Sequence, residues 1–137
     1  MNIKRLSIGA IVGAVLIYGL GILFWQVLFA GFFESNSGSA MGVDRDMPIL
    51  WAIALGALLY ADLITYVIER GGSKSVVGGA QAGAIVGLLL WGTADFTMYG
   101  FFNLSNLAAT IADTVLEGVR GGISGAVIAA VLAKVGD

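Results

Sequence analysis

The sequence predicts an all-α protein, an integral membrane four-helix transmembrane bundle with up-down-up-down topology and glycine-rich helix packing. Three observations lead to this fold class. Only 12% of the 137 residues are charged and 58% are hydrophobic, whereas soluble domains carry about 25% charged and about 45–50% apolar residues. A helix needs about 20 residues to cross a hydrocarbon core, and four apolar stretches are at least that long. The 21 glycines are typical of membrane helices that pack through close backbone contact.

The four spans are expected over residues 6–33, 48–68, 76–102 and 107–135, in a single domain of residues 1–137. The first stretch is far longer than the about 7–15 apolar residues of a signal peptide, so we expect it to be a retained helix. The connection between the last two spans, about 103–106, is very short. The third and fourth helices are therefore expected to be antiparallel neighbours.

Two details of the helix ends follow from polar residues. Asp46 lies just ahead of Pro48, the only proline, which predicts a capping carboxylate and a proline in the first turn of the second helix. The fourth span begins with several polar residues, which leaves an alternative open. In that alternative, residues 103–117 form an interfacial helix and the true span begins near Gly118.

Basic residues predict the orientation. Five of the seven would lie on one side of the membrane: Lys4, Arg5, Arg70, Lys74 and Lys134. The opposite side has only Arg45, and Arg120 falls within a span. The positive-inside rule then places both termini in the cytoplasm, and we expect the protein in a bacterial inner membrane with the lipid bilayer as its main partner.

The composition also excludes several classes of function. The chain has no cysteine and no histidine, so disulfides, thiolate metal sites and the commonest metal and haem ligand are excluded. We expect no metal and no cofactor, and no phosphate-loop or dinucleotide motif is present. A net charge of −2 argues against nucleic-acid binding.

Small-residue motifs predict how the helices pack. GxxxG spacing occurs at Gly9/Gly13, Gly79/Gly83/Gly87, Gly118/Gly122 and Gly121/Gly125. Such spacing lets helix backbones approach closely, and packing within the bundle is the first expectation. The fourth helix carries two glycine faces, which is more than one partner helix requires, so a homo-oligomer is the alternative.

Five ionisable residues fall within the predicted spans: Asp62, Asp95, Asp113, Glu117 and Arg120. Each costs roughly 2.5–3.5 kcal/mol at mid-helix on insertion scales, so they should face one another or water. Polar residues of the last span recur every three or four positions, which places Thr110, Asp113, Glu117 and Arg120 on one helix face. Four acids and one arginine cannot all be charged in a dry interior, so protons, a cation or water should share the space.

Depth along the helices predicts two polar layers. Gln26, Asp95 and Asp113 form an outer layer, and Asp62, Glu117 and Arg120 form an inner one near the midplane. Trp91 lies one turn before Asp95 and is expected to wall the pocket, while most outer aromatic residues form an interfacial belt. The predicted ligand-binding residues are Gln26, Asp62, Trp91, Asp95, Tyr99, Thr110, Asp113, Glu117 and Arg120.

Three functions are compatible with this pattern. The leading hypothesis is a polar pocket that binds or transports a cation, a proton or a small polar or amphipathic molecule. The alternative is an intramembrane enzyme, in which Asp62, Asp95 or Asp113 serves as acid or nucleophile for epoxide opening, isomerisation or cyclisation of a lipophilic substrate. The third is an accessory subunit of a larger membrane complex. The carboxylates could also serve only to tie the helices together.

One part of the chain resembles a known family. The glycine-spaced segment 83–87, the run Thr93-Ala94-Asp95-Phe96-Thr97 and the pair Ala112-Asp113 resemble the C-terminal half of a domain-of-unknown-function family of small four-helix bacterial membrane proteins. The sequence departs from that family where Glu117 precedes Gly118, in place of a tryptophan. The resemblance implies Asp95 and Asp113 as motif positions and implies no biochemical activity.

Overall fold

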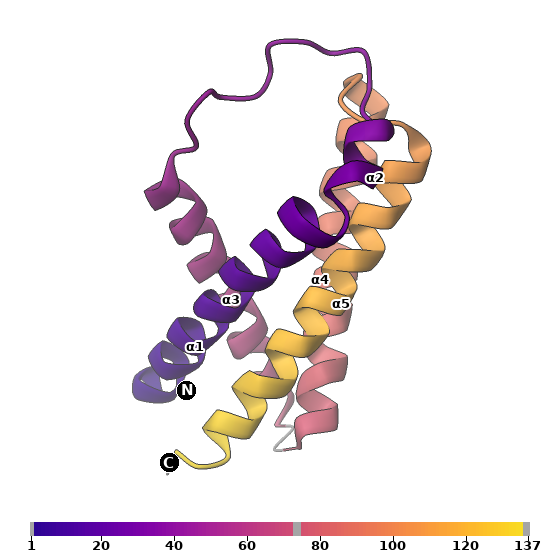
Figure 1. The fold of residues 1–137 in the computed structure, drawn as a ribbon. Coiled ribbons are helices and arrows are strands. Elements are labelled where there is room, and N and C mark those ends of the chain that lie inside the picture. Colours follow the sequence, from indigo (N-terminus) through magenta and orange to yellow (C-terminus); the bar gives the residue numbers. More distant parts are fainter. Residues whose placement is uncertain (1, 73–74, 136–137) are drawn as a thin grey trace.

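The computed structural model describes residues 2–72 and 75–135. Its helices are α1 (Ile3–Gly21), the π-helix η1 (Ile22–Leu28), α2 (Ala30–Ser35), α3 (Leu50–Gly71), α4 (Val76–Phe101) and α5 (Leu107–Leu132). Four stretches are long and apolar enough to cross a membrane: Ile3–Leu28, Leu50–Gly71, Val76–Phe101 and Leu107–Leu132. The all-α four-helix bundle is therefore confirmed, and the two ends of the chain lie at the same end of the bundle (Figure 1). Lys74, one of the residues used for the orientation, lies outside the described residues.

The helix ends differ from the predicted ones in three places. The first span is not one helix, because η1 interrupts it and the chain bends at Phe29 before α2. The predicted cap of the second span is wrong, since α3 begins at Leu50 with Ile49 as the N-cap and Asp46 lies outside the helix. The last span is one continuous helix, capped by Asn106 Oδ1, which accepts a hydrogen bond from Ala109 N at 2.9 Å. Residues 107–117 therefore do not form a separate interfacial helix.

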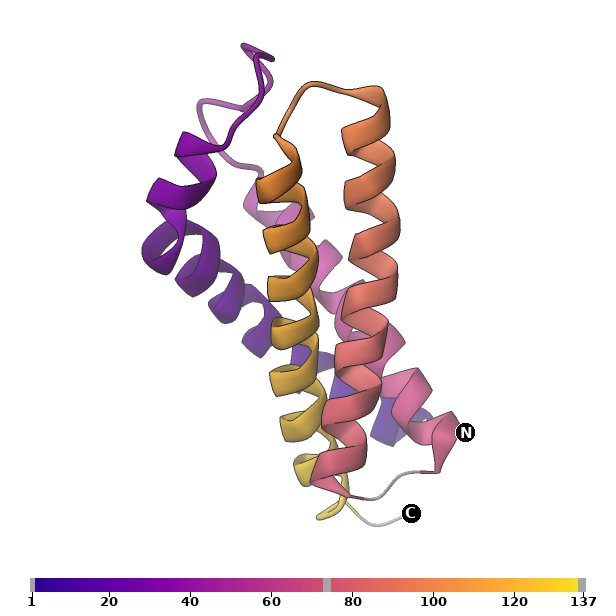
Figure 2. The same ribbon diagram turned by 90° about the vertical axis from the view of Figure 1, so that its right-hand side faces the viewer.

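Helices α4 and α5 are side by side along their whole length (Figure 2). Their glycines allow this approach. A Cβ atom on Gly83 would lie 2.0 Å from the carbonyl oxygen of Gly121, and one on Gly79 would lie 2.4 Å from that of Gly125. The two backbones are thus in direct contact. In lipid no hydrophobic effect drives helices together, so this close packing holds α4 and α5 to each other.

We call the end of the bundle with Ile3 and Leu132 the inner end and the opposite end the outer end, as labels for the two ends of the molecule. Helices α1 and α3 cross in the inner half. A Cβ atom on Gly13 would lie 2.8 Å from Ala61 Cβ, and one on Gly9 would lie 2.4 Å from Thr65 Cγ2. The buried core of large side chains lies around this crossing and comprises Ile17, Tyr60, Ile64, Ile68, Ile128 and Leu132. Beyond the crossing, the outer half of α3 diverges from η1 and α2 (Figure 1).

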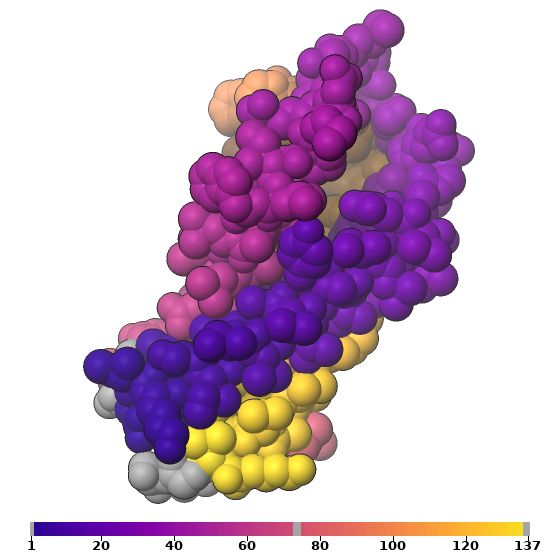
Figure 3. All heavy atoms as spheres, turned by 60° about the vertical axis from the view of Figure 1, so that its left-hand side comes forward, coloured from indigo at the N-terminus to yellow at the C-terminus, as the bar shows by residue number. Residues whose placement is uncertain are grey.

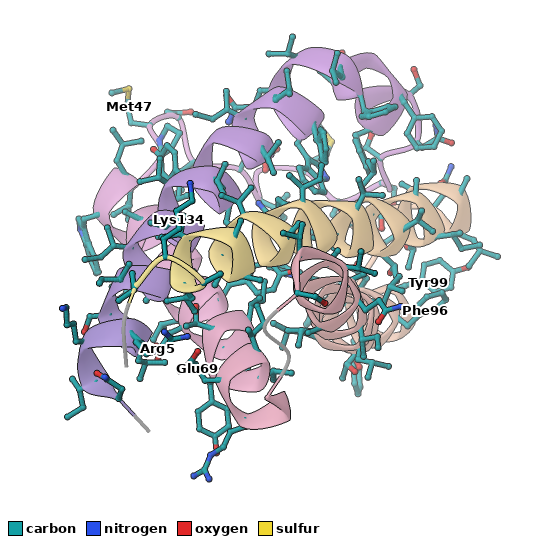
Figure 4. All side chains as sticks on the ribbon, turned by 90° about the horizontal axis from the view of Figure 1, so that it is seen from below. Arg5, Met47, Glu69, Phe96, Tyr99 and Lys134 are labelled. Carbon is teal, nitrogen blue, oxygen red and sulfur yellow. The ribbon has the colours of Figure 1, made fainter. Side chains whose placement is uncertain are left out.

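Each end of the bundle is fastened by polar contacts. At the inner end, Arg5 forms an ion pair with Glu69 at 2.9 Å and donates to the carbonyl oxygen of Leu132 at 3.0 Å. Figure 4 shows the Arg5 and Glu69 side chains pointing toward one another. At the outer end, Asn106 N donates to Asn36 O at 3.0 Å, which joins the end of α2 to the start of α5.

Candidate functional site

A cavity of about 440 Å³ lies between η1 and the diverging outer half of α3. We call it the interhelical cavity. Figure 3 shows it as a hollow between α3 and the η1–α2 segment, with atoms from the later part of the chain at its floor. Most of its lining is apolar, as at Ile22, Leu50 and Ile53, and its polar lining comprises Tyr18, Gln26, Tyr60, Trp91 and Arg120. Its volume falls within the roughly 300–1,000 Å³ of typical small-molecule pockets.

Arg120 lies at the floor of this cavity and is paired with Glu117. Its Nε donates to Glu117 Oε2 at 3.0 Å, and its Nη2 donates to Oε1 at 2.6 Å. A third hydrogen bond runs from Nη1 to the carbonyl oxygen of Ile17 at 3.2 Å. The side chains of Arg120 and Glu117 are 12% and 4% exposed, so this is a buried bidentate ion pair, the strongest form of such a contact.

Three aromatic rings surround the guanidinium. Its central carbon lies 4.9 Å from the ring centre of Trp25, 5.6 Å from that of Tyr60 and 6.0 Å from that of Trp91. These distances fall within the range of cation–π attraction. A Cβ atom on Gly21 would lie 2.8 Å from Arg120 Nη1, so glycine leaves the room that the guanidinium occupies.

Asp95 and Asp113 come together on the other side of Trp25. Both residues line a smaller cavity of about 180 Å³. Thr114 Oγ1 donates to Asp95 Oδ2 at 2.9 Å, and the indole N–H of Trp25 donates to Asp113 Oδ1. Trp25 therefore contacts both groups at once, with its ring face on Arg120 and its N–H on Asp113.

Side chains from both parts of the first span line the interhelical cavity. Tyr18 and Ile22 line it, and Gln26 continues the same four-residue spacing, so all three lie along one side of the span. Over Ile22–Leu28 the helix is a π-helix, which closes its hydrogen bonds over five residues, as between Phe29 N and Phe24 O at 2.9 Å.

Other predicted site residues lie apart from this cluster. Asp62 is half-buried and lies about 200° around α3 from Tyr60, the residue that faces Arg120. Tyr99 is 42% exposed on the outside of α4 (Figure 4). Thr110 is buried, but its hydroxyl donates to Asn106 O at 2.9 Å in the first turn of α5. The predicted outer and inner layers are therefore not arranged as expected.

Two residues at the centre of the site were not among the predicted ligand-binding residues. Trp25 lies near the end of an apolar stretch, where residues of an interfacial aromatic belt occur, and its position in the sequence therefore indicates a belt residue. The position of Tyr60 in the sequence could have indicated that it faces the interior. It lies four residues before Ile64 and three after Ala57, and all three are on the buried face of α3.

Within residues 2–72 and 75–135, no group of three acidic side chains is close enough to hold a metal ion. Comparison of the chain with protein-family models, with curated proteins and with solved structures found no match. The resemblance of residues 83–97 to a family of unknown function therefore stays one of short motifs. Function has to be inferred from the geometry of the chain itself.

Proposed function

We propose that this membrane protein binds a small amphipathic molecule in the interhelical cavity. The proposal rests on one observation: the cavity has apolar sides and a polar floor. Its sides are apolar and include Ile22, Leu50 and Ile53, while the guanidinium of Arg120 lies at its floor. A ligand with an apolar body and one polar end fits this division, because its polar end finds hydrogen bonds that lipid does not offer.

The other hypotheses find less support in this geometry. No carboxyl group lies among the described residues that line the cavity, so the cavity wall offers no carboxylate to hold a cation, and Arg120 at its floor is already paired with Glu117. An acid–base enzyme would need a carboxyl group at the ligand. None of Asp62, Asp95 and Asp113 is among the described residues that line the cavity, and Trp25 stands between it and the latter two.

The test of binding uses a substitution that fills the cavity without disturbing the fold. Gly56 lines the cavity, and a Cβ atom there would meet nothing within 4 Å. We expect Gly56→Phe to fold normally and to weaken ligand binding at least about tenfold, because the ring occupies the space of the ligand body. Binding is measured by quenching of tryptophan fluorescence with a dibrominated fatty-acid methyl ester. The protein carries Trp51→Phe, because Trp51 is 72% exposed and would report on any brominated lipid.

Gly19→Phe is the matched control. Gly19 also lies within the first span and has nothing within 4 Å of an added Cβ atom, but it is not part of the cavity lining. This variant should bind the probe as the parent does. Quenching that never saturates, or equal quenching of the Gly56→Phe and Gly19→Phe proteins, would show that the cavity does not bind amphiphiles.

We further propose the orientation that the basic residues predict, with both termini in the cytoplasm of a bacterial cell. The interhelical cavity then lies in the outer half of the membrane. The chain has no cysteine, so a maleimide can label only the cysteine that is introduced. A cysteine in place of Ser39, which is exposed in the connection after α2, should be labelled by an impermeant maleimide from outside intact cells. A cysteine in place of Ser75 should be labelled only after lysis, and the reverse pattern would refute the orientation.

A further inference from the structure

The polar end of the bound molecule can be narrowed to one kind of chemical group. We propose that it is an uncharged carbonyl oxygen, as in an ester, an amide or a ketone, and that Gln26 and Arg120 hold it by donating hydrogen bonds. This inference rests on the proposed function, because it concerns the ligand of the same cavity. It follows from the hydrogen-bond donors left over at the cavity wall, from the local charge and from the depth of Arg120.

Hydrogen-bond donors are in excess at the floor. A guanidinium has five N–H donors, and Arg120 uses three of them on Glu117 and on the carbonyl of Ile17. Two N–H groups are therefore left without a partner in the part of the chain that the structure describes. Gln26 also lines the cavity, and its amide makes no hydrogen bond to any described residue. A ligand oxygen at the floor would accept from the guanidinium, whose side chain is only 12% exposed and whose unpaired donors are therefore costly. The amide of Gln26, which is exposed, can donate a second hydrogen bond to the same oxygen.

The rings of Trp91 and Tyr60 complete the floor. They lie 6.3 Å apart, centre to centre, and both line the cavity. The indole N–H of Trp91 is enclosed and has no acceptor within the described residues, so the donors that a ligand can reach are those of Arg120 and Gln26.

The charges around the floor favour an uncharged ligand. The positive charge of Arg120 is already matched by the bidentate carboxylate of Glu117. Two further acids, Asp95 and Asp113, lie behind Trp25. An anionic ligand would add a negative charge where acids already outnumber bases, and a buried charge without compensation is costly. A carbonyl group accepts the same hydrogen bonds without that cost.

The depth of Arg120 separates this ligand from ordinary bilayer lipid. Arg120 lies halfway along α5 (Leu107–Leu132), which places it near the middle of a hydrocarbon core about 30 Å thick. The ester carbonyls of a phospholipid lie near the surface of the bilayer, beside its headgroups. A free lipophilic molecule can place its carbonyl at the floor, so we expect it to be the source.

The experiment compares three dibrominated probes with the same chain: a methyl ester, an alkyl sulfonate and an alkane. The 137-residue chain with Trp51→Phe is placed in bilayer discs of ether-linked phosphatidylcholine, which contains no ester carbonyl. We expect the ester to quench saturably at a concentration at least about tenfold below that of the sulfonate or the alkane. Gln26→Leu should weaken ester binding roughly three- to tenfold, as expected for the loss of one hydrogen bond, and should leave alkane quenching unchanged.

Gln81→Leu is the matched control. Gln81 is a glutamine on the exposed side of α4, away from the interhelical cavity, so its loss should not change ester binding. Tighter binding of the sulfonate than of the ester, or unchanged ester binding in Gln26→Leu, would overturn the carbonyl assignment while the cavity remained a binding site. Absence of saturable quenching by all three probes would instead refute the proposed function.

A last arm distinguishes the two sources of a carbonyl. Ester-linked phosphatidylcholine is mixed into the discs before the ester probe is added. If the ester-linked lipid does not compete, the site is assigned to a free lipophilic molecule, as we expect from the depth of Arg120. Competition assigns it to bilayer lipid, and it overturns the depth argument but keeps the carbonyl assignment.

Discussion

Replacement of Arg120 by methionine is expected to destabilise the protein by about 3–5 kcal/mol, the typical effect of removing one partner of a buried ion pair. The reason is the state of Glu117, whose side chain is only 4% exposed. Without Arg120 it keeps a carboxylate that has lost two charge-assisted hydrogen bonds. The carbonyl oxygen of Ile17 loses a donor as well, so α1 and α5 are held less firmly together.

The double variant Arg120→Met with Glu117→Gln should regain much of this loss, because it removes both charges together. Stability is measured by equilibrium unfolding in mixed micelles with an increasing fraction of sodium dodecyl sulfate. Arg45→Met serves as the control, since Arg45 is exposed in the connection between α2 and α3 and its loss should change the free energy of unfolding little. If the double variant were as unstable as Arg120→Met alone, the uncompensated carboxylate would not be the cause.

Replacement of Gly83 by leucine is expected to disrupt the contact between α4 and α5. Overpacking a core with side chains typically costs about 1–3 kcal/mol, occasionally more. Here the obstacle is backbone, because a Cβ atom would lie 2.0 Å from the carbonyl oxygen of Gly121. No side-chain rotation relieves such a clash, so the helices must separate and we expect a cost above that range. The same unfolding assay measures it.

Two other glycines serve as controls for this substitution. Gly100 lies on the same helix as Gly83 and has nothing within 4 Å of an added Cβ atom, so Gly100→Leu should be tolerated. At Gly122 the nearest atom would be Ala84 Cβ at 3.4 Å, an ordinary contact. The backbone oxygen of Ala80 would lie at 3.5 Å, also an ordinary contact. Gly122→Leu should therefore cost less stability than Gly83→Leu, and it tests the predicted homo-oligomer. Equal loss of stability in all three variants would contradict direct backbone contact at Gly83.

The bundle could be predicted because its signals are local in sequence. Apolar stretches of about 20 residues have few alternatives to a spanning helix, and the glycine spacing identified the contact surface between α4 and α5. The interruption of the first span had no such signal. The residues of η1, Ile22–Leu28, are as apolar as those before them, and nothing in their composition distinguishes a π-helix from an α-helix.

The candidate site was only partly accessible to the same reasoning. Glu117 and Arg120 are three residues apart on one helix, so their pairing follows from helical geometry. Equal depth from the outer ends of α4 and α5 brought Asp95 and Asp113 together. Depth alone says nothing about direction around a helix, and this is why Asp62 was grouped with Arg120 although it lies on another side of α3. The contact of Trp25 with Arg120 joins two helices far apart in the sequence, and no local pattern of the first span predicts it.

The crossing of α1 and α3 has a mechanical consequence for the cavity. The two helices touch where Gly13 faces Ala61. The first turns of α3, residues 50–56, extend beyond this contact along the cavity, and we call them the arm of α3. Residues 41–49, which are exposed throughout, tether that arm to the rest of the chain, and nine residues can extend about 30 Å. A shift of this arm would not stretch the connection. We therefore expect the cavity to widen or narrow with the thickness of the bound molecule, while Tyr60 and the core around it stay in place.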